Sequence, residues 1–198
     1  MSELPVRTRP SHFTLPNILT MSRIAVVPLI VATLYAVEGA VAHWIAFGLF
    51  LFASATDYLD GYLARAMSLQ SQLGRMLDPI ADKLLVGVSI LMLVYDDTIA
   101  GHAIWAAAII LFREITVSGL REFLAELNVK LHVTHLAKWK TGIQMMAVGA
   151  LLLGPGTTPI WGVVDITEVG LGLLWISAIL TIVTGLDYLK AALRNIED

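Results

Sequence analysis

Long apolar segments recur along this 198-residue chain and leave it few ways to fold. An α-helix needs about 20 mostly apolar residues to cross the hydrocarbon core of a bilayer. Segments of that length follow one another through the sequence, and 57% of all residues are hydrophobic. A soluble domain is usually about 45–50% apolar. The sequence therefore predicts an all-α, polytopic membrane protein.

Polar turns, some of them rich in Gly and Pro, divide the apolar sequence into six expected transmembrane helices. These helices cover residues 17–37, 43–66, 74–95, 101–126, 134–153 and 166–192. We expect residues 1–16 to form a short polar arm beside the membrane, and residues 17–198 to form a single transmembrane domain around a polar cavity. Because the chain has no cysteine, a disulfide framework, thiolate chemistry and a Cys-based metal site are excluded.

The positive charges gather on one side of this expected arrangement. That side holds both termini and all 13 Lys and Arg residues, which are Arg7, Arg9, Arg23, Arg65, Arg75, Lys83, Arg113, Arg121, Lys130, Lys138, Lys140, Lys190 and Arg194. On the opposite side there is no Lys or Arg, and the charged residues are all acidic, namely Glu38, Asp96, Asp97, Asp165 and Glu168. Since basic loops stay in the cytoplasm, we expect a multi-pass protein of the inner membrane with both termini on the cytoplasmic side.

Four aspartates interrupt the apolar sequence of the second and third expected helices. Asp57 and Asp60 are three residues apart, and Asp78 and Asp82 are four apart. On a helix each pair shares one face. Carboxylates this close repel one another unless cations lie between them. Oxygen ligands without nearby Cys or His suit hard divalent ions, so the pattern predicts a site for Mg²⁺ or Mn²⁺ at the cytoplasmic side.

Such a site favours phosphoryl transfer, because divalent ions neutralise phosphate oxygens and stabilise a leaving group. Gly61 and Ala64 continue the face of the first aspartate pair and leave room for a bulky group. Arg65 follows and can bind a phosphate oxygen in a forked contact. Asp82, the last of the four aspartates, is the candidate general base for an attacking hydroxyl.

A second set of charges lies near the fourth and fifth expected helices. It consists of Arg113, Arg121, Lys138 and Lys140. These side chains can form an anion pocket beside the metal ions, which implies an acceptor that itself carries a phosphate. The alternative is that they only anchor the helix ends at an anionic membrane surface.

The aspartates also belong to a longer pattern, D-x₂-D-G-x₂-A-R-x₈-G-x₃-D-x₃-D. Its fixed positions are Asp57, Asp60, Gly61, Ala64, Arg65, Gly74, Asp78 and Asp82. This pattern resembles the signature of the CDP-alcohol phosphatidyltransferases. The resemblance implies a homodimer of six-helix chains with two divalent ions in a cytoplasm-facing site. It implies that Asp57, Asp60, Asp78 and Asp82 hold the ions, that Asp82 also deprotonates the acceptor, and that Gly61, Ala64, Arg65 and Gly74 accommodate the CDP portion.

Further segments are similar to the branch of this family that makes phosphatidylglycerophosphate, namely residues 15–23, 112–115, 120–122 and 138–141. That branch transfers phosphatidyl from CDP-diacylglycerol to sn-glycerol 3-phosphate and releases CMP. The resemblance implies that CDP-diacylglycerol also contacts Asn17, Thr20 and Arg23. It implies that the acceptor phosphate is bound by Arg113, Lys138, Lys140 and Arg121.

Two other functions stay open on the sequence alone. The acceptor could be inositol phosphate or serine, since basic residues near the fourth and fifth helices serve several acceptors. A cation transporter is a remote alternative, because carboxylates inside a membrane also line ion paths. A transporter would carry charges at several depths, whereas this acidic cluster lies at one end of the spans. The expected partners are the two substrates, membrane lipids and a second copy of the chain, and no nucleic acid.

Overall fold

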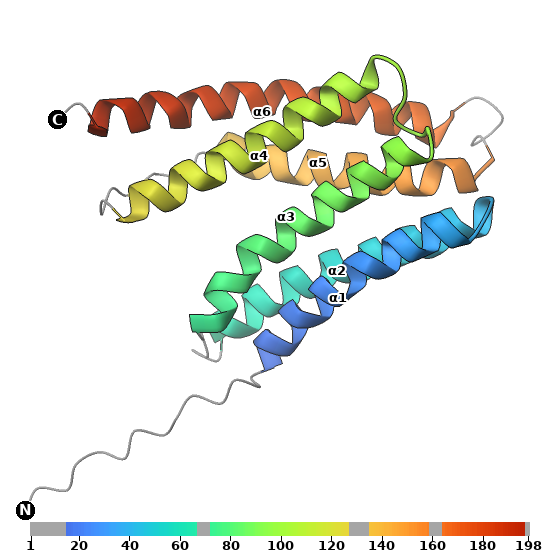
Figure 1. Cartoon of the computed structure of the whole chain (residues 1–198), viewed down its shortest axis with the longest axis horizontal. Helices are drawn as coiled ribbons and strands as arrows, with labels where there is room; N and C mark the ends of the chain where they lie inside the picture. The colour runs from blue at the N-terminus through green and yellow to red at the C-terminus, as the bar shows by residue number, and fades with distance from the viewer. Residues whose placement is uncertain (1–14, 67–71, 127–134, 159–163, 197–198) are drawn as a thin grey trace, which may run out of the picture.

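A computed structural model of the chain describes residues 15–66, 72–126, 135–158 and 164–196. These residues form six α-helices and one short 3-10 helix (Figure 1). They are α1 (Leu15–Ala36), α2 (Ala40–Ala66), α3 (Gln72–Tyr95), α4 (Ala103–Glu126), α5 (His135–Leu153), η1 (Gly154–Gly156) and α6 (Ile166–Ile196). The all-α prediction is confirmed for this part of the chain. The expected polar arm falls almost wholly on residues 1–14, which lie outside it.

Four segments of the described helices are long and apolar enough to cross a membrane. They are Asn17–Ala36, Ala40–Leu59, Ala103–Ala125 and Ile166–Lys190. The chain is therefore a membrane protein with several spans. α3 and α5 are less uniformly apolar because charged residues lie in their first turns, among them Asp78, Asp82 and Lys140. That these two helices also cross the membrane stays a prediction.

The helices form two groups of three (Figure 1). In one group α1 packs against both α2 and α3, and in the other α6 packs against both α4 and α5. α5 also contacts α2 and α3 and so connects the two groups. Successive helices run in opposite directions, so the start of α1 and the end of α6 lie at the same end of the molecule (Figure 1). The ends of α2 and α4 and the starts of α3 and α5 lie there as well.

Apolar side chains fill the space between the helices. Every helix contributes at least one large buried residue, for example Ile30, Phe50, Ile90, Ile110, Leu151 and Leu174. Many other large apolar side chains point outward and are exposed, among them Leu29, Phe112 and Ile179. A soluble protein rarely exposes apolar surface on this scale. The outer surface of the helices is therefore suited to contact with lipid chains.

Gly170 allows α5 and α6 to approach closely. A Cβ atom at Gly170 would lie 2.8 Å from Cγ of Leu151 and 3.1 Å from its backbone nitrogen. We expect Gly170→Ala to destabilise the protein by about 1–3 kcal/mol, because α6 or Leu151 must move. Thermal unfolding in detergent should show a melting temperature lower by about 5 °C. Gly172→Ala is the matched control, since nothing lies within 4 Å of its added Cβ. Equal melting temperatures for the two variants would contradict this account.

Candidate active site

Two aspartates of the predicted metal site lie on either side of one buried guanidinium. Nη1 of Arg23 lies 2.7 Å from Oδ1 of Asp57 and 2.6 Å from Oδ1 of Asp82. The Arg23 side chain is fully buried, whereas both carboxylates are about half exposed. Arg23 of α1 thereby connects Asp57 of α2 with Asp82 of α3, although these residues are far apart in the sequence. A cation between two carboxylates offsets the repulsion between their negative charges.

A second residue of α1 contacts the third aspartate. Oγ1 of Thr20 donates a hydrogen bond of 2.7 Å to Oδ1 of Asp78. Thr20 and Arg23 are three residues apart and share one face of α1, and Asn17 is also buried. The sequence predicts that these three α1 residues contact CDP-diacylglycerol. In the structure Thr20 and Arg23 contact the aspartates, and their contact with a substrate stays a prediction.

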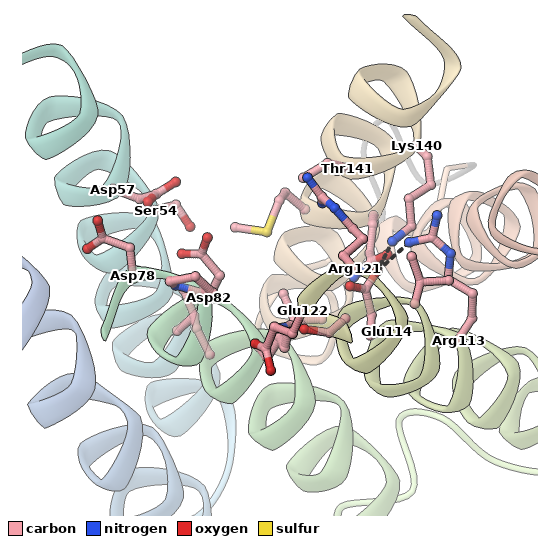
Figure 2. Close-up of a pocket in the computed structure, with 18 of the residues that line it drawn as sticks. Ser54, Asp57, Asp78, Asp82, Arg113, Glu114, Arg121, Glu122, Lys140 and Thr141 are labelled. Atoms are coloured by element: carbon pink, nitrogen blue, oxygen red, sulfur yellow. Dashed lines mark hydrogen bonds and ion pairs between the residues drawn. The ribbon is translucent and has the colours of Figure 1, made fainter. Parts of the chain in front are cut away.

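A cavity of about 620 Å³ extends from these aspartates to α4 and α5. On one side it is lined by Asp57, Asp78 and Asp82, which we call the carboxylate wall. On the other side it is lined by Arg113, Arg121 and Lys140, which we call the basic wall. Figure 2 shows the two walls facing each other across the cavity. Glu114 and Glu122 of α4 line the cavity as well. Each wall is therefore made by one of the two helix groups, and the group with the basic wall contributes three cations and two carboxylates to the cavity.

Contacts with α6 hold the two arginines of the basic wall. Nη2 of Arg113 donates a hydrogen bond of 3.0 Å to Oγ1 of Thr184. The guanidinium carbons of Arg113 and Arg121 lie 5.8 and 5.9 Å from the ring centre of Tyr188, within the range of a cation–π interaction. A Cβ atom at Gly185 would lie 3.1 Å from Cγ of Arg113, so the absence of a side chain there makes room for the arginine.

The third cation of the basic wall is paired with a carboxylate that the sequence analysis leaves without a role. Nζ of Lys140 forms an ion pair with Oε1 of Glu114. Nη1 of Arg113 lies 3.6 Å from the same oxygen. Lys140 is almost completely buried. Glu114 thus places two cations, from α4 and α5, beside each other and offsets part of their repulsion.

Lys83 connects α3 to α4 at the cavity. It follows Asp82 directly, lines the cavity and donates a hydrogen bond from Nζ to Oγ of Ser118. The sequence indicates this location, because an ionisable side chain inside an apolar helix usually faces a protein interior or a water-filled cavity. The family resemblance gives Lys83 no role.

Some predicted site residues are not placed in the cavity. Lys138 is exposed and is not among the residues that line it. Residues two apart on a helix do not share a face, which separates Lys138 from Lys140. Gly74 is buried near the start of α3. The last turns of α2 carry Asp60, Gly61, Ala64 and Arg65, and at these positions the structure describes only the helical backbone.

Comparison with known proteins identifies the family. Residues 13–183, most of the chain, match the CDP-alcohol phosphatidyltransferases. The chain belongs to the CDP-alcohol phosphatidyltransferase family. The resemblance drawn from the aspartate pattern is therefore confirmed.

Similar members of this phosphatidyltransferase family come from bacteria and plants. A protein of Rickettsia felis named CDP-diacylglycerol–glycerol-3-phosphate 3-phosphatidyltransferase is 45% identical over 89% of this chain and 94% of its own length. A protein of the same name from Cereibacter sphaeroides is 36% identical over 94% of this chain and 99% of its own length. A rice protein named cardiolipin synthase (CMP-forming) is 37% identical over 93% of this chain and 59% of its own length.

The carboxylate wall of this phosphatidyltransferase suits a hard divalent cation. Its side chains offer only oxygen atoms, as Mg²⁺ and Mn²⁺ prefer. The position of Arg23 shows that Asp57 and Asp82 lie close enough to share one positive charge. Within the described residues there is no group of three or more Asp, Glu or His side chains that could hold a metal ion. The fourth predicted ligand, Asp60, is not among the side chains included in that search.

Proposed function

We propose that this phosphatidyltransferase transfers a phosphatidyl group from CDP-diacylglycerol to sn-glycerol 3-phosphate, giving phosphatidylglycerophosphate and CMP. The observation that carries the proposal is one cavity with a carboxylate wall opposite a basic wall. Such a cavity suits two anionic substrates, one on metal ions at the carboxylates and the other on the cations. The names of the Rickettsia felis and Cereibacter sphaeroides relatives support the same pair of substrates.

The residues proposed to hold the ions are Asp57, Asp60, Asp78 and Asp82. Two bound Mg²⁺ or Mn²⁺ ions would neutralise the diphosphate of CDP-diacylglycerol and stabilise the CMP leaving group. Gly61, Ala64, Arg65 and Gly74, with Asn17, Thr20 and Arg23, are proposed to form the site for the nucleotide lipid. Thr20 and Arg23 would act there partly by fixing the orientation of the aspartates that they contact.

Asp82 is the proposed general base. One of its oxygens is held by Arg23, and its half-exposed carboxylate lines the cavity. Its carboxylate would take the proton of the acceptor hydroxyl as the hydroxyl oxygen bonds to the phosphorus that carries diacylglycerol. The bond from that phosphorus to the oxygen of CMP breaks, and CMP leaves with that oxygen.

The proposed acceptor site is the basic wall. Arg113 and Lys140 are held beside each other by Glu114, and Arg121 lies over the same Tyr188 ring as Arg113. The phosphate of the acceptor would compete with Glu114 for these cations, and its free hydroxyl would face Asp82. The family resemblance also implies Lys138, but because Lys138 is exposed and does not line the cavity, we propose Lys140 as the α5 cation that binds the phosphate.

We also propose that the protein lies in the cytoplasmic membrane with both termini and the cavity on the cytoplasmic side. The confinement of all 13 Lys and Arg residues to the expected cytoplasmic side supports this orientation. The start of α1 and the end of α6 at one end of the molecule are consistent with it (Figure 1). The homodimer and the division at residue 16 stay predictions.

An assay with purified protein tests the proposed reaction. CDP-diacylglycerol, Mg²⁺ and a panel of acceptors are supplied, and both CMP release and the lipid product are measured. The panel contains glycerol 3-phosphate, inositol phosphate and serine, with phosphatidylglycerol added because one relative is named cardiolipin synthase. We expect glycerol 3-phosphate to be used with the highest kcat/KM. Preferential use of another acceptor would overturn the proposal, as would metal-dependent ion flux in liposomes without any CMP release.

Two lysines of α5 provide a matched test of the acceptor site. Lys140→Met should raise the KM for glycerol 3-phosphate by about tenfold or more, because a hydrogen bond between charged groups contributes about 1.5–3 kcal/mol. Lys138→Met should change that KM by less than about twofold, since Lys138 is exposed and does not line the cavity. The KM for CDP-diacylglycerol should stay unchanged in both. A larger effect at Lys138 would place the acceptor phosphate outside the cavity.

A further inference from the structure

One buried amide in the cavity has an oxygen without a hydrogen-bond partner among the described residues, and it has no part in the chemistry described so far. Gln144 lies on α5, is only 4% exposed and lines the cavity. Its Oε1 atom has no hydrogen-bond partner among the described residues. A buried polar group without a partner costs about 1–3 kcal/mol of stability. An amide kept at such a position in a cavity points to a ligand group that bonds to it.

Its place on α5 indicates which group of the acceptor it can reach. Gln144 follows Lys140 by one helical turn, about 6 Å along the axis. The face of α5 that carries both residues lines the cavity, and α5 also packs against α3, which carries Asp82. α5 therefore carries Lys140 of the basic wall and also contacts α2 and α3, the helices of the carboxylate wall. Gln144 lies on this same helix.

The chemistry of the side chain fits a neutral hydroxyl rather than a phosphate. An amide carries no charge, and its oxygen accepts one hydrogen bond from a hydroxyl group. Phosphates bind cations, which the basic wall already supplies. Glycerol 3-phosphate has three polar groups in line, which are the phosphate, the middle hydroxyl and the terminal hydroxyl that reacts. The phosphate and the reacting hydroxyl are accounted for by the basic wall and Asp82, and the middle hydroxyl is not.

We propose that Gln144 determines acceptor specificity by accepting a hydrogen bond from the middle hydroxyl of the acceptor, next to the hydroxyl that reacts. This inference rests on the proposed function, because it places the acceptor between the two walls. A site built to bond a hydroxyl discriminates against an analogue that lacks it, since the buried amide then stays without a partner.

The test compares two acceptors that differ only in this hydroxyl. They are glycerol 3-phosphate and 3-hydroxypropyl phosphate, which keeps the phosphate and the reacting hydroxyl. We expect the wild-type protein to use glycerol 3-phosphate with a kcat/KM about tenfold higher. In Gln144→Met, which has a similar shape and no amide, the ratio should fall close to one. The loss should come from glycerol 3-phosphate, while kcat/KM for 3-hydroxypropyl phosphate stays within about twofold.

Thr181→Val is the matched control. Oγ1 of Thr181 is likewise buried and without a partner among the described residues, but Thr181 does not line this cavity. Both variants remove a buried polar group and should melt no lower than the wild type. Only Gln144→Met should change the ratio between the two acceptors. A change in both variants, or in neither, would overturn the inference.

The outcomes separate this inference from the proposed function. Absence of CMP release from the wild-type protein with either acceptor would reject the proposed function itself. Release with both acceptors at equal kcat/KM in the wild type would reject only the role of Gln144, even if Gln144→Met did not fold. An unchanged ratio in folded Gln144→Met would reject that role as well.

Discussion

Replacing Asp82 by Asn should lower the rate of CMP release by about a thousandfold. Asparagine keeps the shape of the side chain but removes its charge, so it can neither take a proton from the acceptor nor bind a divalent ion well. A positioned general base contributes about 10²–10⁴-fold on its own. The fold should persist, because Asp57 remains 2.7 Å from Nη1 of Arg23. The measurement is kcat with saturating CDP-diacylglycerol and glycerol 3-phosphate, beside a melting curve of each protein.

Asp97→Asn is the control for this substitution. Asp97 is exposed in the turn between α3 and α4 and does not line the cavity. Its φ of 60° is a conformation that asparagine adopts more readily than most residues. We expect full activity and an unchanged melting temperature for this variant. If Asp82→Asn kept more than about a tenth of the wild-type rate, Asp82 would not be the general base.

The sequence predicts the all-α class of the described residues because each helix is specified locally. Apolar length and polar turns indicate where a helix begins and ends, whereas Pro28 and Pro79 lie inside α1 and α3. The spacing of Asp78 and Asp82 likewise places both on one face of α3, and the structure brings them to one cavity with Asp57. These predictions need no knowledge of how the helices pack.

Contacts between helices are less accessible from the sequence. Helical periodicity shows which residues share a face of one helix. It does not show which neighbouring helix packs against that face. The family resemblance implies that Arg23 contacts a substrate, which stays a prediction, but the sequence does not show that its guanidinium lies between carboxylates of α2 and α3. The pairing of Glu114 with Lys140 and the contacts of Tyr188 with two arginines were missed for the same reason.

The two lysines of α5 illustrate a signal that the sequence does contain. Lys138 and Lys140 were treated as one basic group, although residues two apart on a helix point to different faces. Gln144 shares a face with Lys140, four residues before it, and Thr141 shares a face with Lys138, three residues before it. Spacing therefore separates the two lysines but does not show which of them faces the cavity, where the structure places Lys140, Thr141 and Gln144.

The second large effect is a loss of stability, expected when Arg23 is replaced. Arg23→Met should lower the free energy of unfolding by about 2 kcal/mol, because it removes the cation between Asp57 and Asp82. Breaking a fully buried ion pair costs about 3–5 kcal/mol, and the smaller value is expected here because both carboxylates are about half exposed. The melting temperature should fall by about 5 °C in metal-free buffer. Arg121→Met, which changes an exposed arginine of the basic wall, should lower it by less than about 2 °C.

The response to Mg²⁺ shows whether these carboxylates form the metal site. A ligand that binds only the folded protein stabilises it, and more strongly as its affinity increases. Without Arg23 the two carboxylates lack their cation in the protein, so a divalent ion at the same place relieves more repulsion. Added Mg²⁺ should therefore raise the melting temperature of Arg23→Met by more than that of the wild type or of Arg121→Met. Equal increases in all three proteins would mean that the ion binds away from Asp57 and Asp82. A reduced increase in Arg23→Met would mean that Arg23 holds these carboxylates in the arrangement that the metal needs.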